Sequence, residues 1–286
     1  MKTRIAHWST RILAPALAAT LSITGVSAQA QAPFDHGYRA YAKVLDAHVQ
    51  VPRVDYAALV KNRQQLDAVV EELGRVSSTA YDSWTRTQQI AFWINAYNVF
   101  TLRSIVDNYP IEGGWFSLHP SNSIRQIDGV WDELRWEAGG RSVTLDQIEH
   151  EILRPTFKEA RAHFAVNCAS VSCPPLQPEP YIAERLDAQL DAAARAYLGS
   201  EHGLQLRGSR LELSSILDWY GDDFIAEFAS QLPGGRPAKE RSVLAVVATF
   251  GPPEAAALAK SDKARVGYLS YDWSLNDVAT APGGSP

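Results

Sequence analysis

Apolar residues recur at helical spacing through the first part of the chain. Residues 34–49 and 56–76 each show one apolar stripe with polar residues between its members, and this pattern predicts two helices. Residues 51–56 lack that period and predict a short extended segment. From Ser83 to Asn108 the chain is apolar almost all round, which predicts a long, buried central helix that ends before Pro110.

Alternating patterns follow this helix. Residues 133–145 and 204–213 each contain two extended runs around a tight turn, Gly-Gly in the first and Gly-Ser in the second, and both predict β-hairpins. Residues 161–167 and 265–273 alternate in the same way and predict strands. Helices at both ends, with short strands and hairpins between them, predict an α+β fold around the long buried central helix.

A short helix is predicted for residues 144–155. Thr144 is a suitable N-cap, Gln147 stands three residues later as its partner in a capping box, and Pro155 is expected to end the helix. A long buried helix, then hairpins and a strand with a histidine, is loosely similar to papain-like and transglutaminase-like folds. In those folds the nucleophilic cysteine opens the central helix, whereas the corresponding region here contains none.

The first thirty residues indicate the cellular compartment in which the two cysteines are expected. Lys2, Arg4 and Arg11 precede an apolar run that ends in the small-residue sequence 28–30, the pattern of a secretory signal peptide. The run is too short and too rich in small residues for a membrane span. We therefore expect a periplasmic or secreted protein whose mature chain begins near Gln31 and has no membrane span.

Charge and composition narrow the class of partner. The chain has 286 residues, and beyond the predicted signal peptide 24 basic residues face 32 acidic ones, a net charge of −8. No basic stripe for nucleic acid is present. Residues 31–279 suit a single domain, and residues 280–286 read as a disordered tail. The expected ligand is a small molecule or peptide-like compound of unknown identity, and no cofactor or metal is predicted.

Both cysteines lie in one short stretch, Cys168 and Cys173. In an exported protein they favour a disulfide that closes a small loop. A thiolate nucleophile with His163 or His150 as its base, a redox-active pair and a zinc site remain alternatives, and the zinc site lacks a second cysteine pair. In a regular strand 161–167, His163 and Cys168 would point to opposite faces, which argues against their direct contact.

Other polar residues fall where chemistry could occur. Asn95 and Asn98 lie one turn apart on one face of the predicted central helix, either bonded to loop backbone or orienting a catalytic group. Glu149 borders the apolar stripe of the helix 144–155, while His150 points elsewhere. As a pair they could act as acid and base, bind a metal or simply lie on the surface.

Two aromatic segments each carry a carboxylate. Tyr220 and Asp223 stand in the first, and Asp272 and Trp273 in the second. These residues could orient a histidine or contact a ligand, and core packing and capping explain them equally well.

Five segments in order resemble the DUF547 family, a domain of unassigned function: AFWINAYNVFTL, LDQIEHEILR, HFAVNCASVSCPPL, LSSILDWYGDDF and YLSYDWSLND. The resemblance runs from about residue 56 to about residue 276. It implies a single domain and gives little mechanism, although some eukaryotic relatives are fused to glutaredoxin-like domains. Ala169 stands where many relatives carry glycine, so the resemblance implies a less tight turn behind Cys168.

The sequence leaves three functions open and does not decide whether the protein is an enzyme. The first is a thiol-dependent hydrolase or transferase on an acyl or peptide-like substrate, with Cys168 as nucleophile, a histidine as base and Asn95 or Asn98 as the orienting amide. The second is a non-catalytic binding or scaffold domain with a Cys168–Cys173 disulfide. The third is a thiol–disulfide redox protein.

Overall fold

The long apolar segment forms a helix, α5, that spans Arg86–Asn108 in the computed structural model. The structure describes residues 33–114 and 117–280, so the predicted signal peptide, 1–30, and all but the first residue of the predicted tail, 280–286, lie outside it. The chain divides into two units after Pro33, and only the second, from Phe34 onwards, is described beyond a single residue. The second unit contains all regular structure among the described residues.

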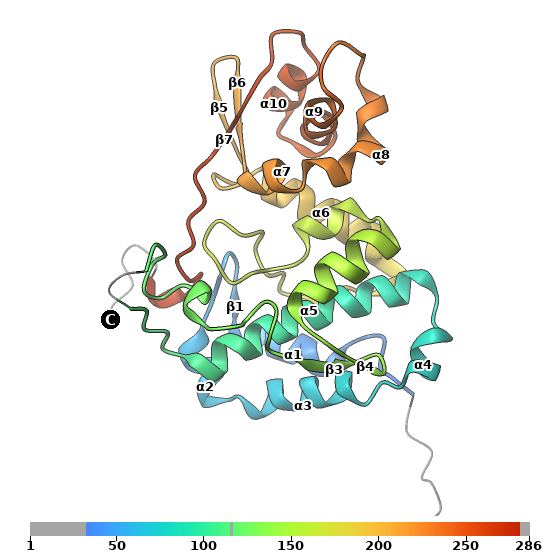
Figure 1. Ribbon diagram of the computed structural model, residues 1–286, viewed down its shortest axis with the longest axis vertical. Helices are drawn as coiled ribbons and strands as arrows, with labels where there is room; N and C mark the ends of the chain where they lie inside the picture. Colours follow the sequence, from blue (N-terminus) through green and yellow to red (C-terminus); the bar gives the residue numbers. More distant parts are fainter. Residues whose placement is uncertain (1–32, 115–116, 281–286) are drawn as a thin grey trace, which may run out of the picture. The chain divides into compact units, whose positions relative to one another are not determined.

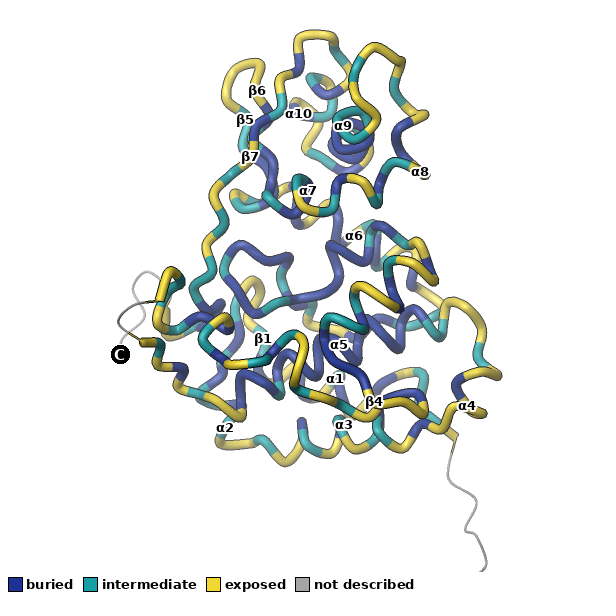
Figure 2. The backbone as a smooth tube through the Cα atoms, in the orientation of Figure 1, coloured by how far each residue is buried: buried dark blue, intermediate teal, exposed yellow. Residues whose placement is uncertain are grey.

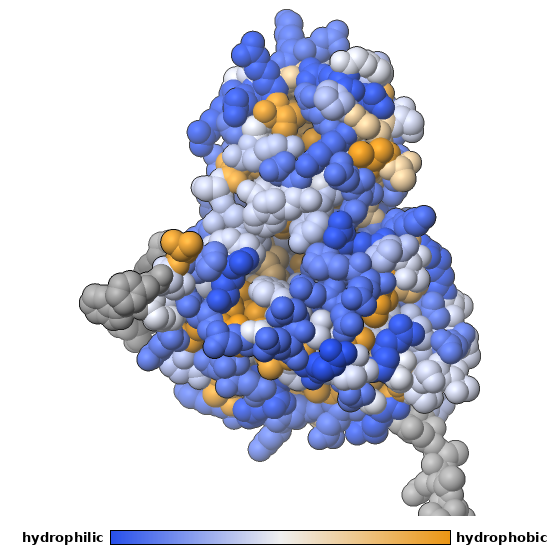
Figure 3. Space-filling view, in the orientation of Figure 1, coloured by the Kyte–Doolittle hydropathy of each residue, from blue (hydrophilic) through white to orange (hydrophobic). Residues whose placement is uncertain are grey.

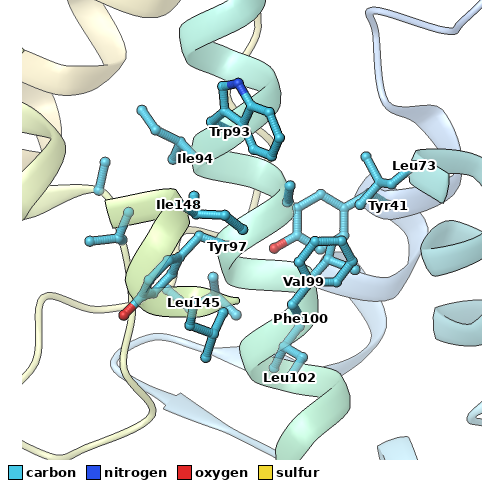
Figure 4. Packing of buried hydrophobic residues seen from close by; sticks show 14 of the residues in the cluster. Tyr41, Leu73, Trp93, Ile94, Tyr97, Val99, Phe100, Leu102, Leu145 and Ile148 are labelled. Carbon is cyan, nitrogen blue, oxygen red and sulfur yellow. The ribbon is translucent and has the colours of Figure 1, made fainter. Parts of the chain in front are cut away.

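A first hydrophobic core surrounds α5, whose side chains are buried on nearly every side. Ile94 and Tyr97 lie on the side of the helix that faces Ile148, while Phe100 lies towards Tyr41 (Figure 4). A helix that is apolar all round must be covered on all sides. From residue 33 onwards, four helices precede α5: α1 (Arg39–His48), α2 (Tyr56–Lys61), α3 (Gln64–Gly74) and α4 (Ser78–Asp82).

Two antiparallel hairpins accompany this core; the sequence predicts the one at residues 133–145, whereas it predicts only an extended segment at residues 51–56. The strands β1 (Val49–Gln50) and β2 (Arg53–Val54) form the first, and β3 (Trp136–Ala138) and β4 (Arg141–Val143) the second. The single predicted helix over 56–76 is divided into α2 and α3. Its two halves therefore take different directions around α5 (Figure 1).

Residues between Ala160 and Ala264 build a second hydrophobic core, around helix α9 (Figure 1). A three-stranded sheet, β5-β6-β7, covers part of it, with β5 and β6 antiparallel and β7 parallel to β6. The strands are β5 (Leu204–Arg207), β6 (Arg210–Leu213) and β7 (Arg265–Tyr268). The helices are α6 (Leu186–Leu198), α7 (Ser215–Trp219), α8 (Ile225–Phe228), α9 (Ala238–Phe250) and α10 (Pro253–Ala259).

Mixed helices and short strands make this an α+β fold, as the sequence predicts. Buried and exposed residues alternate along most elements (Figure 2), and hydrophilic residues cover most of the face seen in Figure 3. Among the described residues, no helix combines the length and apolar character that a membrane crossing requires.

Two local predictions were wrong. Residues 161–167 form no strand, because the short 3-10 helix η3 (Ala160–Phe164) occupies most of them. The helix expected to end at Pro155 continues as the π-helix η2 (Gln147–Phe157). The capping box itself is confirmed: Thr144 N donates to Gln147 Oε1, and Gln147 N donates to Thr144 Oγ1, both at 3.2 Å. The wider π turn accommodates the proline, which lacks the N–H of a regular turn.

Candidate active site

A pocket of about 190 Å³ lies where the two cores meet. Tyr97 of α5 and Val166 come from the first core, and Ile216 belongs to the second. Both Cys168 and Cys173 line it. The segment that carries them is irregular and mostly buried, the dark stretch near the middle of Figure 2. Most of the chemistry-bearing residues of the sequence converge on this pocket.

The two cysteines are free thiols in very close contact. Cys168 Sγ and Cys173 Sγ lie 2.7 Å apart, longer than the roughly 2.05 Å of a disulfide bond. The disulfide expected from the sequence is therefore not formed in this structure. Cys173 is buried, whereas Cys168 is partly exposed. The backbone N–H of Cys168 also donates to Cys173 Sγ at 2.9 Å.

A tight turn behind Cys168 brings the thiols together. Ala169 has φ of 59°, in the left-handed region that glycine adopts more readily than alanine. Asn167 Oδ1 accepts a hydrogen bond from Ala169 N at 3.0 Å and holds the turn. Ser170 pairs with Leu275 in an isolated antiparallel bridge. The turn is thus formed although alanine stands where the family resemblance implied glycine.

The asparagines of α5 bind loop backbone. Asn95 Nδ2 donates to Tyr181 O at 2.7 Å, and Tyr181 N donates to Asn95 Oδ1 at 3.0 Å. Asn98 Nδ2 donates to Ala165 O at 3.0 Å, and Asn167 N donates to Asn98 Oδ1 at 2.8 Å. Asn98 thereby fixes the residue before Cys168, so its amide positions the thiol loop from a rigid helix.

Hydroxyl groups surround the Cys168 sulfur. Tyr271 Oη and Ser170 Oγ each lie 3.2 Å from Cys168 Sγ. Ser170 Oγ also lies 3.0 Å from Tyr271 Oη, so the two hydroxyls and the sulfur form one hydrogen-bonded group. Burial raises the pKa of Cys168, but hydrogen bonds from Cys173, Ser170 and Tyr271 outweigh it and bring this pKa below its ordinary value. Burial and contact with Cys168 raise the pKa of Cys173.

His163 is held between two carboxylates. Its Nε2 lies 2.7 Å from Asp223 Oδ2, and its Nδ1 lies 3.8 Å from Glu149 Oε1. The ring is 4% exposed and stacks on Tyr220 with centroids 4.3 Å apart. Arg154 binds both Asp223 oxygens, at 2.6 and 3.1 Å. Both ring nitrogens of His163 therefore face acidic groups.

Asp223 is the centre of this charged network. Burial raises its pKa, but hydrogen bonds from His163 and Arg154 have the larger combined effect and bring the pKa well below its usual range. Arg154 Nη1 also contacts His150 Nδ1 at 2.9 Å, and His150 Nε2 lies 3.8 Å from Asp146. Glu149 and His150 both line the pocket, so this network forms its polar wall.

Aromatic side chains form another wall. Tyr271 and Trp273 have ring centroids 4.5 Å apart, and Trp219 stacks on Trp273 at 6.0 Å. Arg125 lies over the Trp273 ring at 4.7 Å. Asp272 instead serves the backbone: its N–H donates to Ser172 Oγ, and its Oδ1 accepts from Ser274 N.

The structure brings together Cys168, Cys173, His163, Glu149, His150, Tyr220 and Trp273, which all line the pocket. Asp223 does not line the pocket but contacts His163, which does, whereas Asn95 and Asn98 bind the backbone of neighbouring loops. Sequence reasoning missed Tyr271, Ser170 and Arg125. Tyr271 and Ser170 fall inside segments already singled out, but only the folded chain places their hydroxyls on the sulfur. Among the described residues, no group of three or more His, Cys, Asp or Glu side chains could hold a metal ion.

Removing the hydroxyl of Tyr271 tests its contact with the thiol. Tyr271→Phe is expected to raise the pKa of Cys168, because the thiolate loses a hydrogen-bond donor. Alkylation of Cys168 at neutral pH should slow roughly tenfold, the low end for a hydrogen bond to a charged group. Iodoacetamide labelling followed by mass spectrometry over a range of pH measures this. Tyr268→Phe, at an exposed tyrosine, is the control, and an unchanged profile for Tyr271→Phe would contradict the expectation.

The chain matches one protein family model. Residues 81–198 fit the model described as "Protein of unknown function, DUF547", a stretch that contains α5, η2, η3 and both cysteines. No curated protein and no solved structure matches the chain. The loose similarity to papain-like and transglutaminase-like folds therefore stays a prediction.

Proposed function

We propose that this chain, whose residues 81–198 match the DUF547 family model, reduces disulfides by thiol–disulfide exchange through Cys168 and Cys173. The observation that carries the proposal is the 2.7 Å separation of the two sulfurs, since an S–S bond can form between them with only a small movement. From the predicted signal peptide alone, we also propose that the protein acts in the periplasm or outside the cell, where disulfides are common.

The two thiols differ in the way that exchange requires. Cys168 is the partly exposed sulfur and carries the lowered pKa, so it is the nucleophile. Cys173 is buried with a raised pKa, and it keeps its proton while Cys168 is a thiolate. An accessible thiolate beside a buried thiol is the arrangement in which the first sulfur attacks and the second resolves.

In the first step Cys168 Sγ attacks one sulfur of the substrate disulfide. A mixed disulfide forms, the substrate S–S bond breaks, and the other substrate sulfur leaves as a thiolate that takes up a proton. The pocket walls bind and orient this substrate. The aromatic side chains of Tyr271, Trp219 and Trp273 suit a peptide or another partly apolar compound.

In the second step Cys173 loses its proton and attacks Cys168 Sγ. The protein disulfide forms and the second substrate sulfur leaves as a thiol. The Cys168 thiolate is one cause of the raised pKa of Cys173, and the first step removes it. Consumption of the first thiolate therefore prepares the second thiol for attack.

A cysteine–histidine hydrolase is less well supported. In residues 33–114 and 117–280, the hydrogen bonds of Cys168 Sγ go to Cys173, Ser170 and Tyr271, and none goes to a histidine. His163 makes its closest contact with Asp223. A nucleophilic thiol of a hydrolase needs a base within hydrogen-bond reach.

The proposal is tested by mixing reduced protein with an excess of a peptide that contains one disulfide. Iodoacetamide labelling of the denatured protein and intact-mass analysis should find both cysteines labelled before the reaction and neither after it, with two peptide thiols released per protein. If both cysteines are still labelled after prolonged incubation with the peptide, the exchange proposal is refuted. A protein disulfide that forms in air but never returns to thiols with reductant in the folded state would indicate the structural bond of the scaffold hypothesis.

A further inference from the structure

A second cavity reaches the thiol pair. It has a volume of about 500 Å³, and its lining includes Cys173, Pro52 and Arg53 of the β1–β2 hairpin, and Glu201 and His202, which precede β5. Cys173 also lines the pocket described above, whereas Cys168 lines that pocket but not the second cavity. The buried cysteine therefore borders both spaces.

The polar groups of this cavity are suited to an anion. Arg53 Nη1 donates to Asp277 O at 2.9 Å, and no carboxylate among the described residues forms an ion pair with its guanidinium. His202 adds a ring that is partly paired, with Nε2 lying 3.6 Å from the exposed Glu201 carboxylate. A guanidinium without an anionic partner is the preferred protein ligand for a carboxylate.

A buried amide group in the same wall lacks a partner. Asn276 is 2% exposed and lines the cavity. Its Oδ1 accepts the Tyr56 hydroxyl at 2.8 Å, which fixes the amide, while its Nδ2 has no hydrogen-bond partner. An unsatisfied buried donor is unfavourable, so a ligand oxygen that accepted this hydrogen bond would remove that cost.

We propose that this cavity, called here the Arg53 cavity, binds a small thiol that carries a carboxylate and that this thiol returns electrons to the protein through Cys173. The proposal rests on the exchange function, because it supplies the step that restores the dithiol. Arg53, Asn276 and Cys173 all line the cavity. In the proposed complex the first two bind the carboxylate and the thiolate of the ligand lies next to Cys173.

The chemistry favours attack at Cys173 over attack at Cys168. When the small thiolate attacks Cys173 Sγ, the protein S–S bond breaks and Cys168 leaves as a thiolate, stabilised by Tyr271 and Ser170. Thiols of lower pKa leave faster. A second small thiol then attacks the sulfur of the first, releasing Cys173 as a thiol. The balance is one protein disulfide and two small thiols giving one protein dithiol and one small disulfide.

The experiment measures how fast oxidised protein is reduced by 3-mercaptopropionate and by 2-mercaptoethanol. Each rate is divided by the rate for the same thiol with an unstructured peptide disulfide, which removes differences in intrinsic reactivity. The normalised rate with 3-mercaptopropionate is expected to be about tenfold higher, the factor that one favourable ionic hydrogen bond gives. Arg53→Gln should abolish this advantage, and His202→Gln should reduce it. Arg39→Gln, at an exposed arginine paired with Asp35, should leave it unchanged.

The outcomes separate the two proposals. Equal normalised rates for both thiols, or an advantage that survives in folded Arg53→Gln and His202→Gln proteins, would refute the Arg53 cavity and leave exchange intact. If neither thiol reduces the folded, oxidised protein, exchange itself is refuted. Circular dichroism confirms folding, and if Arg53→Gln does not fold, His202→Gln decides.

Discussion

Cys173→Ser protein should accumulate a stable mixed disulfide with a peptide disulfide, at one bond per protein. Cys168 can still attack, but no second thiol is present to resolve the adduct. Cys168→Ser protein should form this adduct roughly a hundredfold more slowly or not at all, because Cys173 is buried, and burial, the largest cause of its raised pKa, is retained in this variant. Intact-mass analysis without reductant, sampled over time, measures both rates.

The matched pair of serine variants makes this result specific. Serine keeps a hydroxyl that can donate near the remaining sulfur, so the size and hydrogen bonding of the site change little. Peptide adducts on both variants at equal rates would mean that the two thiols are not differentiated. A single thiol that reacts only after unfolding, in either variant, would contradict a role for the pocket.

Asn98→Leu is expected to lower the free energy of unfolding by about 2–6 kcal/mol. The substitution leaves two buried backbone groups without a partner, Ala165 O and Asn167 N, and each unsatisfied group costs about 1–3 kcal/mol. Urea denaturation followed by circular dichroism measures the change. Asn108→Leu, at an exposed asparagine near the end of the same helix, should change stability by less than about 1 kcal/mol.

A loop held by Asn98 also predicts an effect on chemistry. In folded Asn98→Leu protein the segment before Cys168 loses both amide contacts, so the spacing of the two sulfurs should become less well defined. Disulfide formation in air should then slow relative to wild type and to Asn108→Leu. Unfolding at the wild-type urea midpoint would show that the amide does not connect α5 to the loop.

Local sequence determined much of the scaffold. The apolar run over Ser83–Asn108 could only be a buried helix, and Thr85 and Gln88 begin it with a capping box that needs no distant residue. The hairpins at residues 136–143 and 204–213 follow from their turns, since a two-residue glycine turn fixes which strand positions pair. Such patterns are readable because the interactions that enforce them lie within a few residues of one another.

The site depended on contacts that no local pattern carries. The alternating pattern predicted that His163 lies on a strand. In the structure His163 lies on the short 3-10 helix η3, which follows the π-helix η2, and its ring contacts Asp223, 60 residues later in the chain. Tyr271 reaches the Cys168 sulfur from 103 residues away. Tertiary packing outweighs weak local preference in short segments.

The sequence alone determined that this protein has an α+β fold around one buried helix, and that its two cysteines share one short loop. Only the tertiary structure decided which sulfur is exposed, which groups donate to it and that Cys173 borders two cavities. The reason is physical: spacing along the chain sets which residues can meet within a turn, whereas the pKa and accessibility of a thiol depend on burial and on partners supplied by distant segments.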